Sequence, residues 1–227
     1  MAKSERRGGN DLERLYFKDA QFTMPDGACV TVRKTDIPGA NMENVGARHL
    51  ARYGLAAFFC RPGHNVLDFP CGSGYAAEFL KPFGIKYLGL DSDKITIEYA
   101  NRVYSSSDME FKVNDLCHPK LPKSRFHVIG CIEGLEHIEK KYQSPLIGGL
   151  EKALRPGGVL IVSSPENPSG KSGRSSHNPF HLWELTKSDF LKILRQHFQP
   201  QNIELITHRA VLTTGAQTNC LYGICHK

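Results

Sequence analysis

The chain has 227 residues, of which 40% are hydrophobic, and a formal net charge of +6. This length fits one domain with a full core, and no apolar run reaches the roughly 18 residues that would predict a membrane span. The N-terminal residues lack the apolar segment of a secretion signal, and the seven cysteines show no paired C-x-x-C spacing, so we expect reduced thiols in a cytoplasmic protein. The positive charge favours an ordinary soluble surface, with an anionic partner as the alternative.

Residues 1–60 are expected to form an N-terminal tail and a cap segment. We predict that residues 1–14 fray and that Phe22–Lys34 forms a small hairpin around Pro25-Asp26-Gly27. A helix is predicted over residues 42–59, which either covers a ligand cleft or packs on the sheet. Its apolar stripe consists of Val45, His49, Tyr53, Ala56 and Ala57.

A glycine-rich turn follows the buried strand expected at Asn65–Phe69. The turn is Pro70-Cys71-Gly72-Ser73-Gly74, and good helix formers follow at Tyr75–Leu80. Glycines let the backbone approach a ligand closely, and the first turn of the helix presents N–H groups to it. The turn therefore suits a nucleotide-like cofactor.

Asp91 ends the second expected strand, Lys86–Leu90, and lies 17 residues beyond Gly74. A carboxylate at this place accepts hydrogen bonds from both hydroxyls of a ribose in doubly wound folds. The alternative is an ordinary N-cap for a helix that begins near Ser92. The spacing from the glycine turn favours the ribose.

Two cofactor classes fit the turn. Residues 72–77 satisfy the dinucleotide fingerprint G-x-G-x-x-A, so a nicotinamide-binding oxidoreductase is one alternative. However, Asp68 would repel a pyrophosphate placed beside it. Residues 68–74 resemble motif I of the class I S-adenosylmethionine-dependent methyltransferases, usually written D-x-G-C-G-x-G. Pro70 departs from that motif by removing one backbone N–H, and we interpret it as a stiffened loop.

The resemblance continues along the chain and implies S-adenosylmethionine as cofactor. Glu110–Leu116 is similar to the family's third strand, Phe126–Glu133 to its fourth strand and the motif at that strand's carboxyl end, and Leu154–Val162 to its L-x-P-G-G turn and fifth strand. Asn202–His208 and Cys220–His226 supply the last two strands. The resemblance places Asp68 near the methionine end of the cofactor and Asp115 near the adenine. The implied cofactor-binding residues are Asp68, Pro70, Cys71, Gly72, Ser73, Gly74, Asp91, Ser92, Asn114, Asp115, Leu116, Ile132 and Glu133.

The alternation of strands and helices predicts the α/β class. This alternation and the family resemblance together predict a Rossmann-like, doubly wound, seven-stranded, mostly parallel sheet in residues 61–227. Helices should cover both faces, and the last strand should be antiparallel. Residues 164–181 are rich in Ser, Gly and Pro and follow the fifth strand, so we predict a substrate lid, with a disordered insert as the alternative.

Acids and histidines gather after the fourth strand. If this segment is helical, Glu133, Glu136 and His137 share one face, and His181 comes from the far end of the lid. In one reading, His137 is a general base assisted by Glu136. In the other, Glu133, Glu136, His137 and His181 bind Mg, Mn, Fe or Zn and acidify an acceptor hydroxyl.

The E-x-x-E-H pattern with a later histidine resembles two groups of methyltransferases. The ubiquinone-type O-methyltransferases (methyltransferase type 11) often carry N-P-[YF]-H-x-x-E-[FY]-T, similar to residues 178–186. In the small-RNA 3′-terminal 2′-O-methyltransferases the quartet is a metal site. The N-P-P-[YF] motif of many amine methyltransferases is absent after Ile132, which favours oxygen as acceptor. We therefore expect an O-methyltransferase for a sugar, glycan or small polar metabolite, with a metal-dependent RNA 2′-O-methyltransferase as the alternative and nucleic acid as the less favoured partner.

Overall fold

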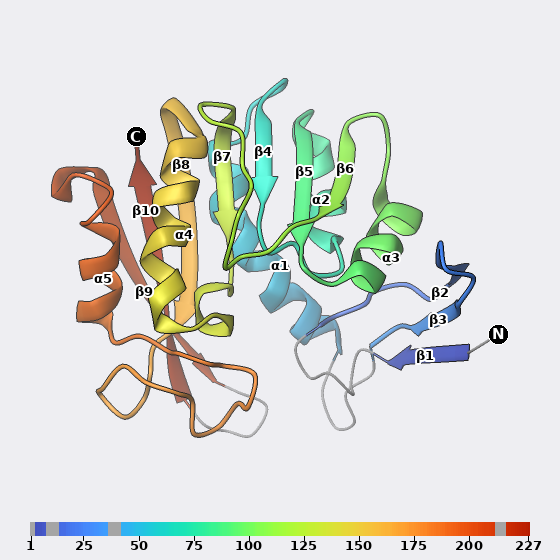
Figure 1. Cartoon of the computed structure of the whole chain (residues 1–227). Coiled ribbons are helices and arrows are strands. Elements are labelled where there is room, and N and C mark those ends of the chain that lie inside the picture. Colours follow the sequence, from blue (N-terminus) through green and yellow to red (C-terminus); the bar gives the residue numbers. More distant parts are fainter. Residues whose placement is uncertain (1–2, 8–13, 36–41, 212–216) are drawn as a thin grey trace.

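The computed structural model describes residues 3–7, 14–35, 42–211 and 217–227. Within them, seven strands form one sheet in the order β6-β5-β4-β7-β8-β10-β9 (Figure 1). β10 runs antiparallel to both β8 and β9, whereas the pairs from β6 to β8 are parallel. The predicted seven-stranded, mostly parallel sheet with an antiparallel last strand is confirmed. The strands are β4 (Asn65–Asp68), β5 (Lys86–Asp91), β6 (Met109–Val113), β7 (Phe126–Cys131), β8 (Leu154–Pro165), β9 (Ile203–Val211) and β10 (Gln217–His226).

Helices cover both faces of this sheet, as predicted. Successive strand residues point to opposite faces, so Val66 packs in the core with residues of α1, α2 and α3, whereas Leu67 packs with residues of α4 and α5. The α-helices are α1 (Met42–Phe59), α2 (Tyr75–Leu80), α3 (Lys94–Tyr104), α4 (Lys140–Ala153) and α5 (Lys187–Leu194). Short 3₁₀ turns are η1 (Lys81–Phe83), η2 (Leu135–His137) and η3 (Pro200–Asn202). No helix of the described residues is long and apolar enough to cross a membrane.

The N-terminal region forms a second, three-stranded sheet. β2 (Ala20–Thr23) and β3 (Cys29–Arg33) are antiparallel, which confirms the predicted hairpin. β1 (Lys3–Arg7) pairs in parallel with β3, so the prediction that these five residues fray is wrong. β3 is thus the central strand of this sheet, and its pairing with β1 satisfies the backbone groups that would otherwise lie at a free edge. Residues 1–2 and 8–13 of the expected tail lie outside the described part of the chain.

α1 spans the predicted residues. In its apolar stripe Tyr53, Ala56 and Ala57 are buried, His49 is half-buried, and the side chain of Val45 lies outside the description. The helix contacts α2, β7 and β8. It therefore packs against the sheet.

Several boundaries differ from the sequence prediction, and β9 and β10 are longer than expected, ending at Val211 and beginning at Gln217 respectively. β6 ends at Val113 rather than Leu116, because the Asn114 side chain bonds to the backbone of Lys120 and the chain turns away. β7 ends at Cys131, since Glu133 adopts a left-handed φ of 52°. β8 extends to Pro165, so the loop begins later than predicted. Bridges between Glu166 and Leu185 and between residues 173 and 184 tie that loop to itself.

Candidate active site

The glycine turn (residues 70–74) joins β4 to α2, and its two glycines serve different purposes. Gly74 has φ +83°, and a Cβ there would lie 2.6 Å from the Phe111 ring, so its lack of a side chain permits close packing. Gly72 has φ +52°, and a Cβ there would meet nothing within 4 Å. Gly72 therefore leaves open space at the turn, as a ligand that approaches the backbone requires.

Asp91 is buried at the end of β5, with 3% of its surface exposed. Its carboxylate accepts hydrogen bonds from the backbone N–H groups of Gly72 (3.1 Å) and Asp93 (3.0 Å). The N-cap of α3 is Asp93, whose side chain accepts from Ile95 and Thr96. The alternative that Asp91 caps the helix is therefore wrong, and Asp91 instead braces the glycine turn.

Arg14 is a neighbour of Asp91 that the sequence pattern did not reveal. Its Nη2 donates to Asp91 Oδ1 at 3.1 Å. The next residue, Leu15, accepts a hydrogen bond from the hydroxyl of Ser73, and the Tyr16 hydroxyl lies 2.9 Å from Thr96 Oγ1. The segment 14–16 thus crosses the glycine turn and reaches α3. No local signal predicts this contact, because 77 residues separate Arg14 from Asp91.

Asp68 lies beneath the turn and is almost fully buried. The hydroxyls of Tyr87 on β5 and Tyr53 on α1 donate to its carboxylate at 2.6 Å and 3.3 Å. Burial raises the pKa of Asp68 to about 7, although the two hydrogen bonds act to lower it. A neighbouring cation would favour the ionised form, which makes this carboxylate sensitive to a positively charged ligand.

Glu133 does not share a helical face with Glu136 and His137. The short helix η2 begins only at Leu135, and the backbone of Glu133 is left-handed. The Glu133 carboxylate accepts from Ser163 Oγ (2.7 Å) and lies 3.6 Å from Arg52 of α1. Burial raises the pKa of Glu133, but the Arg52 charge and the hydrogen bond from Ser163 outweigh it and leave the pKa lowered. Glu133 therefore pairs with α1 and β8.

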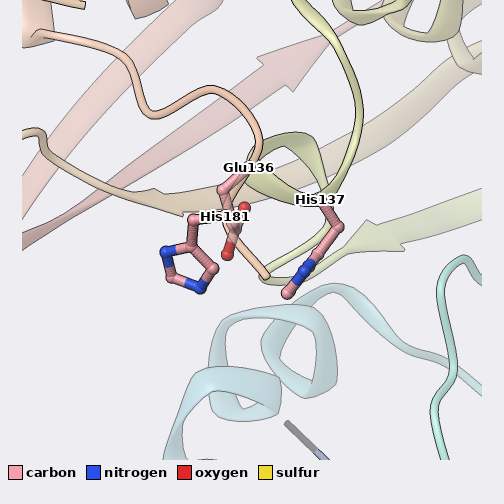
Figure 2. Close-up of side chains that lie close together, drawn as sticks. All are labelled: Glu136, His137 and His181. Atoms are coloured by element: carbon pink, nitrogen blue, oxygen red, sulfur yellow. The ribbon is translucent and has the colours of Figure 1, made fainter. Parts of the chain in front are cut away.

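Glu136, His137 and His181 come together, although 44 residues of chain separate the two histidines. One ligand atom from each lies within 4.8 Å of the others, and Figure 2 shows the Glu136 carboxylate between the two imidazole rings. Glu136 is fully buried, and the ring centroids of the histidines are 5.0 Å apart. Three of the four predicted metal ligands thus meet, and Glu133 lies outside their group.

The loop that carries His181 is anchored to η2. The Glu184 carboxylate lies 2.6 Å from His181 Nδ1, which fixes the orientation of the ring. The Trp183 amide donates to the carbonyl of Glu136 at 3.1 Å. Gln143 of α4 donates to the carbonyls of Leu135 and Trp183 at 2.7 and 2.8 Å. These contacts hold the Glu136–His137–His181 group together from both sides.

Gly134 connects this group to the glycine turn. A Cβ on Gly134 would collide with Pro70 Cδ, so the backbone after β7 packs directly on the turn. The Phe69–Pro70 peptide bond is cis. The open space at Gly72 and the Glu136–His137–His181 group consequently belong to one edge of the sheet, since they follow the ends of β4 and β7. These two strands lie side by side in Figure 1.

The other residues that the resemblance implies surround this edge. Asn114 bonds through its backbone to the carbonyl of Asp91 at 3.0 Å, and Asp115 is exposed, with its carboxylate 3.1 Å from His118 Nδ1. The Cys117 amide and His118 lower the pKa of Asp115. Cys71, Leu116 and Ile132 are buried, and Ser92 is exposed.

Comparisons with known proteins agree with this architecture. The sequence model of a family described as a methyltransferase domain matches residues 41–213. A probable S-adenosylmethionine-dependent methyltransferase of Mycolicibacterium smegmatis is 30% identical over 178 residues, which cover 78% of this chain and 67% of that protein. A ubiquinone biosynthesis O-methyltransferase of Alkalilimnicola ehrlichii is 27% identical over 105 residues, 45% of this chain and 42% of that protein.

A solved structure extends the comparison to the fold. Phosphoethanolamine N-methyltransferase 2 of Haemonchus contortus, in complex with S-adenosyl-L-methionine, has a TM-score of 0.64 at 14% identity. The alignment covers 78% of this chain and 52% of that one. The chain spans 57% to 67% of the length of the mycobacterial relatives that it matches.

Proposed function

The chain belongs to the class I S-adenosylmethionine-dependent methyltransferases, and from that premise we propose that it methylates a hydroxyl of a sugar, a glycan or another small polar metabolite. The observation that carries the proposal is the Glu136–His137–His181 group beside the glycine turn. The family assignment also decides against the nicotinamide alternative. The similarity to ubiquinone O-methyltransferases supports oxygen as the methyl acceptor.

In this proposal the glycine turn and Asp91 hold the cofactor. The ribose hydroxyls donate to Asp91, which Gly72, Asp93 and Arg14 already orient. Asp68 lies near the cationic methionine end, where the positive charge favours its ionised form. Asp115 and the buried Leu116 would flank the adenine, as the family resemblance implies.

The acceptor hydroxyl has to lose a proton when it receives the methyl group. His137 is the group we assign to take that proton, with Glu136 and His181 beside it. The sulfonium is already an activated leaving group, so alignment of the hydroxyl with the methyl carbon supplies much of the remaining rate. The loop after β8, with the exposed Phe180 next to His137, would close over the acceptor as a lid.

As an alternative to the base role of His137, the same group fits a divalent cation. Two imidazoles and one carboxylate are ligands that Mn, Fe and Zn prefer, and their ligand atoms are close enough to share one ion. Glu136, His137 and His181 would hold the ion, and Glu184 would orient His181. A bound ion would supply Lewis acidity that lowers the pKa of the acceptor hydroxyl. Glu133 is committed to Ser163 and Arg52 and is not part of this proposal.

An RNA 2′-O-methyltransferase is the second candidate, because three members of the quartet that resembles that group's metal site meet here. Its affinity for short RNA should fall steeply with salt, since phosphate contacts dominate such binding. A small-molecule enzyme should bind RNA weakly, if at all, and its turnover should not follow this salt dependence.

The test is turnover with labelled S-adenosylmethionine and a panel of acceptors, after chelation and after addition of Mn²⁺. The panel contains nucleotide-sugars, free sugars, phenols, short RNA with a free 2′-hydroxyl, and primary amines. We expect transfer to a hydroxyl. Transfer to amines alone would overturn the proposal. Equal turnover with EDTA and with Mn²⁺ would show that the reaction needs no metal ion, and His137 would remain the proposed base.

A further inference from the structure

A pocket lies at the edge of the sheet opposite the candidate active site, where β4, β7 and β8 begin. Its volume is about 480 Å³, within the range of small-molecule sites. Its lining comes from the end of α1, the residue before β4, the second residue of β7 and the turn at the start of β8. The lining residues are Phe59, Arg61, His64, His127, Arg155, Pro156, Gly157 and Val159. We call this cavity the basic pocket.

The charge of the basic pocket has one sign. Arg61 and Arg155 line it, no carboxylate does, and neither arginine pairs with an acid anywhere in the described ranges. Glu151 pairs with Lys227 at 3.0 Å, and the main-chain oxygen of Lys227 accepts a hydrogen bond from the amide of the lining residue Gly157 at 2.9 Å. Arg61 Nη1 donates to the backbone carbonyls of Phe58 at 2.8 Å and Cys60 at 2.7 Å, which leaves its positive charge without an acidic partner. Two guanidinium groups that share one cavity repel each other, and an anion between them would offset this repulsion.

The hydrogen bonds of His127 leave two donor groups, one on its own ring and one on Arg155, without an acceptor between them. The backbone N–H of Asn65 donates to His127 Nδ1 at 3.0 Å, so the proton of the neutral ring must be on Nε2. Arg155 Nη1 lies 2.6 Å from that Nε2, and a guanidinium group can only donate. Two donors therefore face each other. Arg155 is exposed, so a modest movement would let both groups donate to one anionic oxygen.

His64 adds a further donor or acceptor to the same wall. Its ring stacks on His127 with centroids 4.2 Å apart and planes 14° from parallel. His64 Nδ1 is buried and has no hydrogen-bond partner among the described residues. Burial is the main cause that lowers the pKa of both histidines. Nearby positive charge lowers it further, from Arg61 and Arg155 at His64 and from His64 and Arg155 at His127, although a hydrogen bond to the Phe59 backbone acts to raise the pKa of His64.

We propose that the basic pocket is a second ligand site, which binds the phosphate group of a small phosphorylated molecule through Arg61, Arg155 and His127. Planar guanidinium groups match phosphate oxygens in paired hydrogen bonds. The volume exceeds that of a phosphate group, and the half-buried ring of Phe59 offers an apolar wall for the rest of the ligand. This site is separate from the cofactor and acceptor sites proposed above, because it lies at the other end of the strands.

The test measures binding of inorganic phosphate, pyrophosphate and AMP to the full chain by isothermal titration calorimetry, with chloride at equal ionic strength as reference. Binding should be saturable and at least tenfold weaker in R155Q and in R61Q. R195Q changes an exposed arginine at the end of α5 and should bind like the wild type. Tighter binding of AMP would identify a nucleotide as the source of the phosphate, and tighter binding of inorganic phosphate would identify the free ion.

Binding of S-adenosylhomocysteine to each variant shows whether the variant is folded and whether the two sites are separable. We expect its affinity to remain within about twofold of the wild type in all three. The proposal is wrong if no phosphate-bearing probe binds the wild-type chain, or if R155Q and R61Q, with normal affinity for S-adenosylhomocysteine, bind the probes as tightly as R195Q does. A failed methyltransferase assay would leave this result untouched.

Discussion

Two pairs of histidines lie at opposite edges of the same sheet, and their neighbours give them opposite electrostatic settings. His137 and His181 surround the buried carboxylate of Glu136, and Glu184 holds His181 from behind. His64 and His127 stack beside arginines, which help to lower their pKa values. An imidazole among carboxylates is suited to take up a proton or a cation, whereas one among arginines stays neutral and faces an anion. The charged neighbours of each histidine pair therefore decide which ligand the pair suits.

The largest expected effect tests the carboxylate-rich edge. His137→Ala should lower kcat by about 10²–10⁴-fold, the usual contribution of a general base, because no other group takes the hydroxyl proton. The affinity for S-adenosylhomocysteine should stay nearly unchanged. Steady-state turnover and calorimetry measure the two quantities, and His208→Ala, at an exposed position on β9, serves as control. Unimpaired turnover of His137→Ala would remove the base role.

Asp91 offers the next largest effect. Asp91→Ala should weaken cofactor binding by about 1–3 kcal/mol, the cost of losing charge-assisted hydrogen bonds to the ribose. Asp93→Ala is the matched control, since it removes the N-cap of α3 and should cost stability, about 1 kcal/mol, rather than affinity. If both variants bind S-adenosylhomocysteine as the wild type does, Asp91 has no part in holding the ribose.

Glu184 tests whether the carboxylate-rich group binds a metal ion, because its contact with His181 orients that ring. Glu184→Gln should weaken Mn²⁺ binding by about 10–100-fold, as expected when the partner that orients a histidine ligand is changed. Glu166→Gln, in the same loop, should leave Mn²⁺ affinity intact. Both are measured by competition with a fluorescent chelator. Equal affinities in the two variants would contradict the assigned role of Glu184.

The smallest expected effect concerns pH. Because burial holds the pKa of Asp68 at about 7, raising the pH from 6 to 8 converts the carboxyl group to its ionised form. The cationic methionine end of the cofactor favours that form, so the affinity for S-adenosylmethionine, which carries the positive sulfonium that S-adenosylhomocysteine lacks, should rise up to about tenfold over this interval. Asp68→Asn should show no such rise. If the wild type and Asp68→Asn show the same pH profile of cofactor affinity, Asp68 does not interact with the cofactor.

The stability of the cofactor-free protein should fall as the pH rises, whereas its affinity for the cofactor should increase. The pKa of the folded state lies above that of the unfolded chain, so the contribution of Asp68 to stability is present at low pH and is lost as the pH rises through about 7. Without cofactor, Asp68→Asn should therefore melt at a higher temperature than the wild type at pH 8, and the difference should shrink toward pH 5. Thermal unfolding across this range checks the sign.

Much of the fold followed from local sequence signals. The apolar runs at Asn65, Lys86 and Phe126 begin β4, β5 and β7, and the helical stripe over residues 42–59 matches α1. These signals are local because strand and helix periods depend on neighbouring residues. The strand ends were less accurate, since the left-handed backbone of Glu133 and the side-chain bonds of Asn114 have no periodic signature.

The sequence by itself determined the class of the fold, the glycine turn, the acid at Asp91 and the pairing of an E-x-x-E-H segment with a later histidine. Only the tertiary structure decided which partner each acid contacts. Glu136 lies beside His137 and His181. Glu133 contacts Arg52 and Ser163, and Asp91 pairs with Arg14. The physical reason is distance along the chain. Such pairs depend on where loops return to the sheet, and packing of the whole domain fixes those returns.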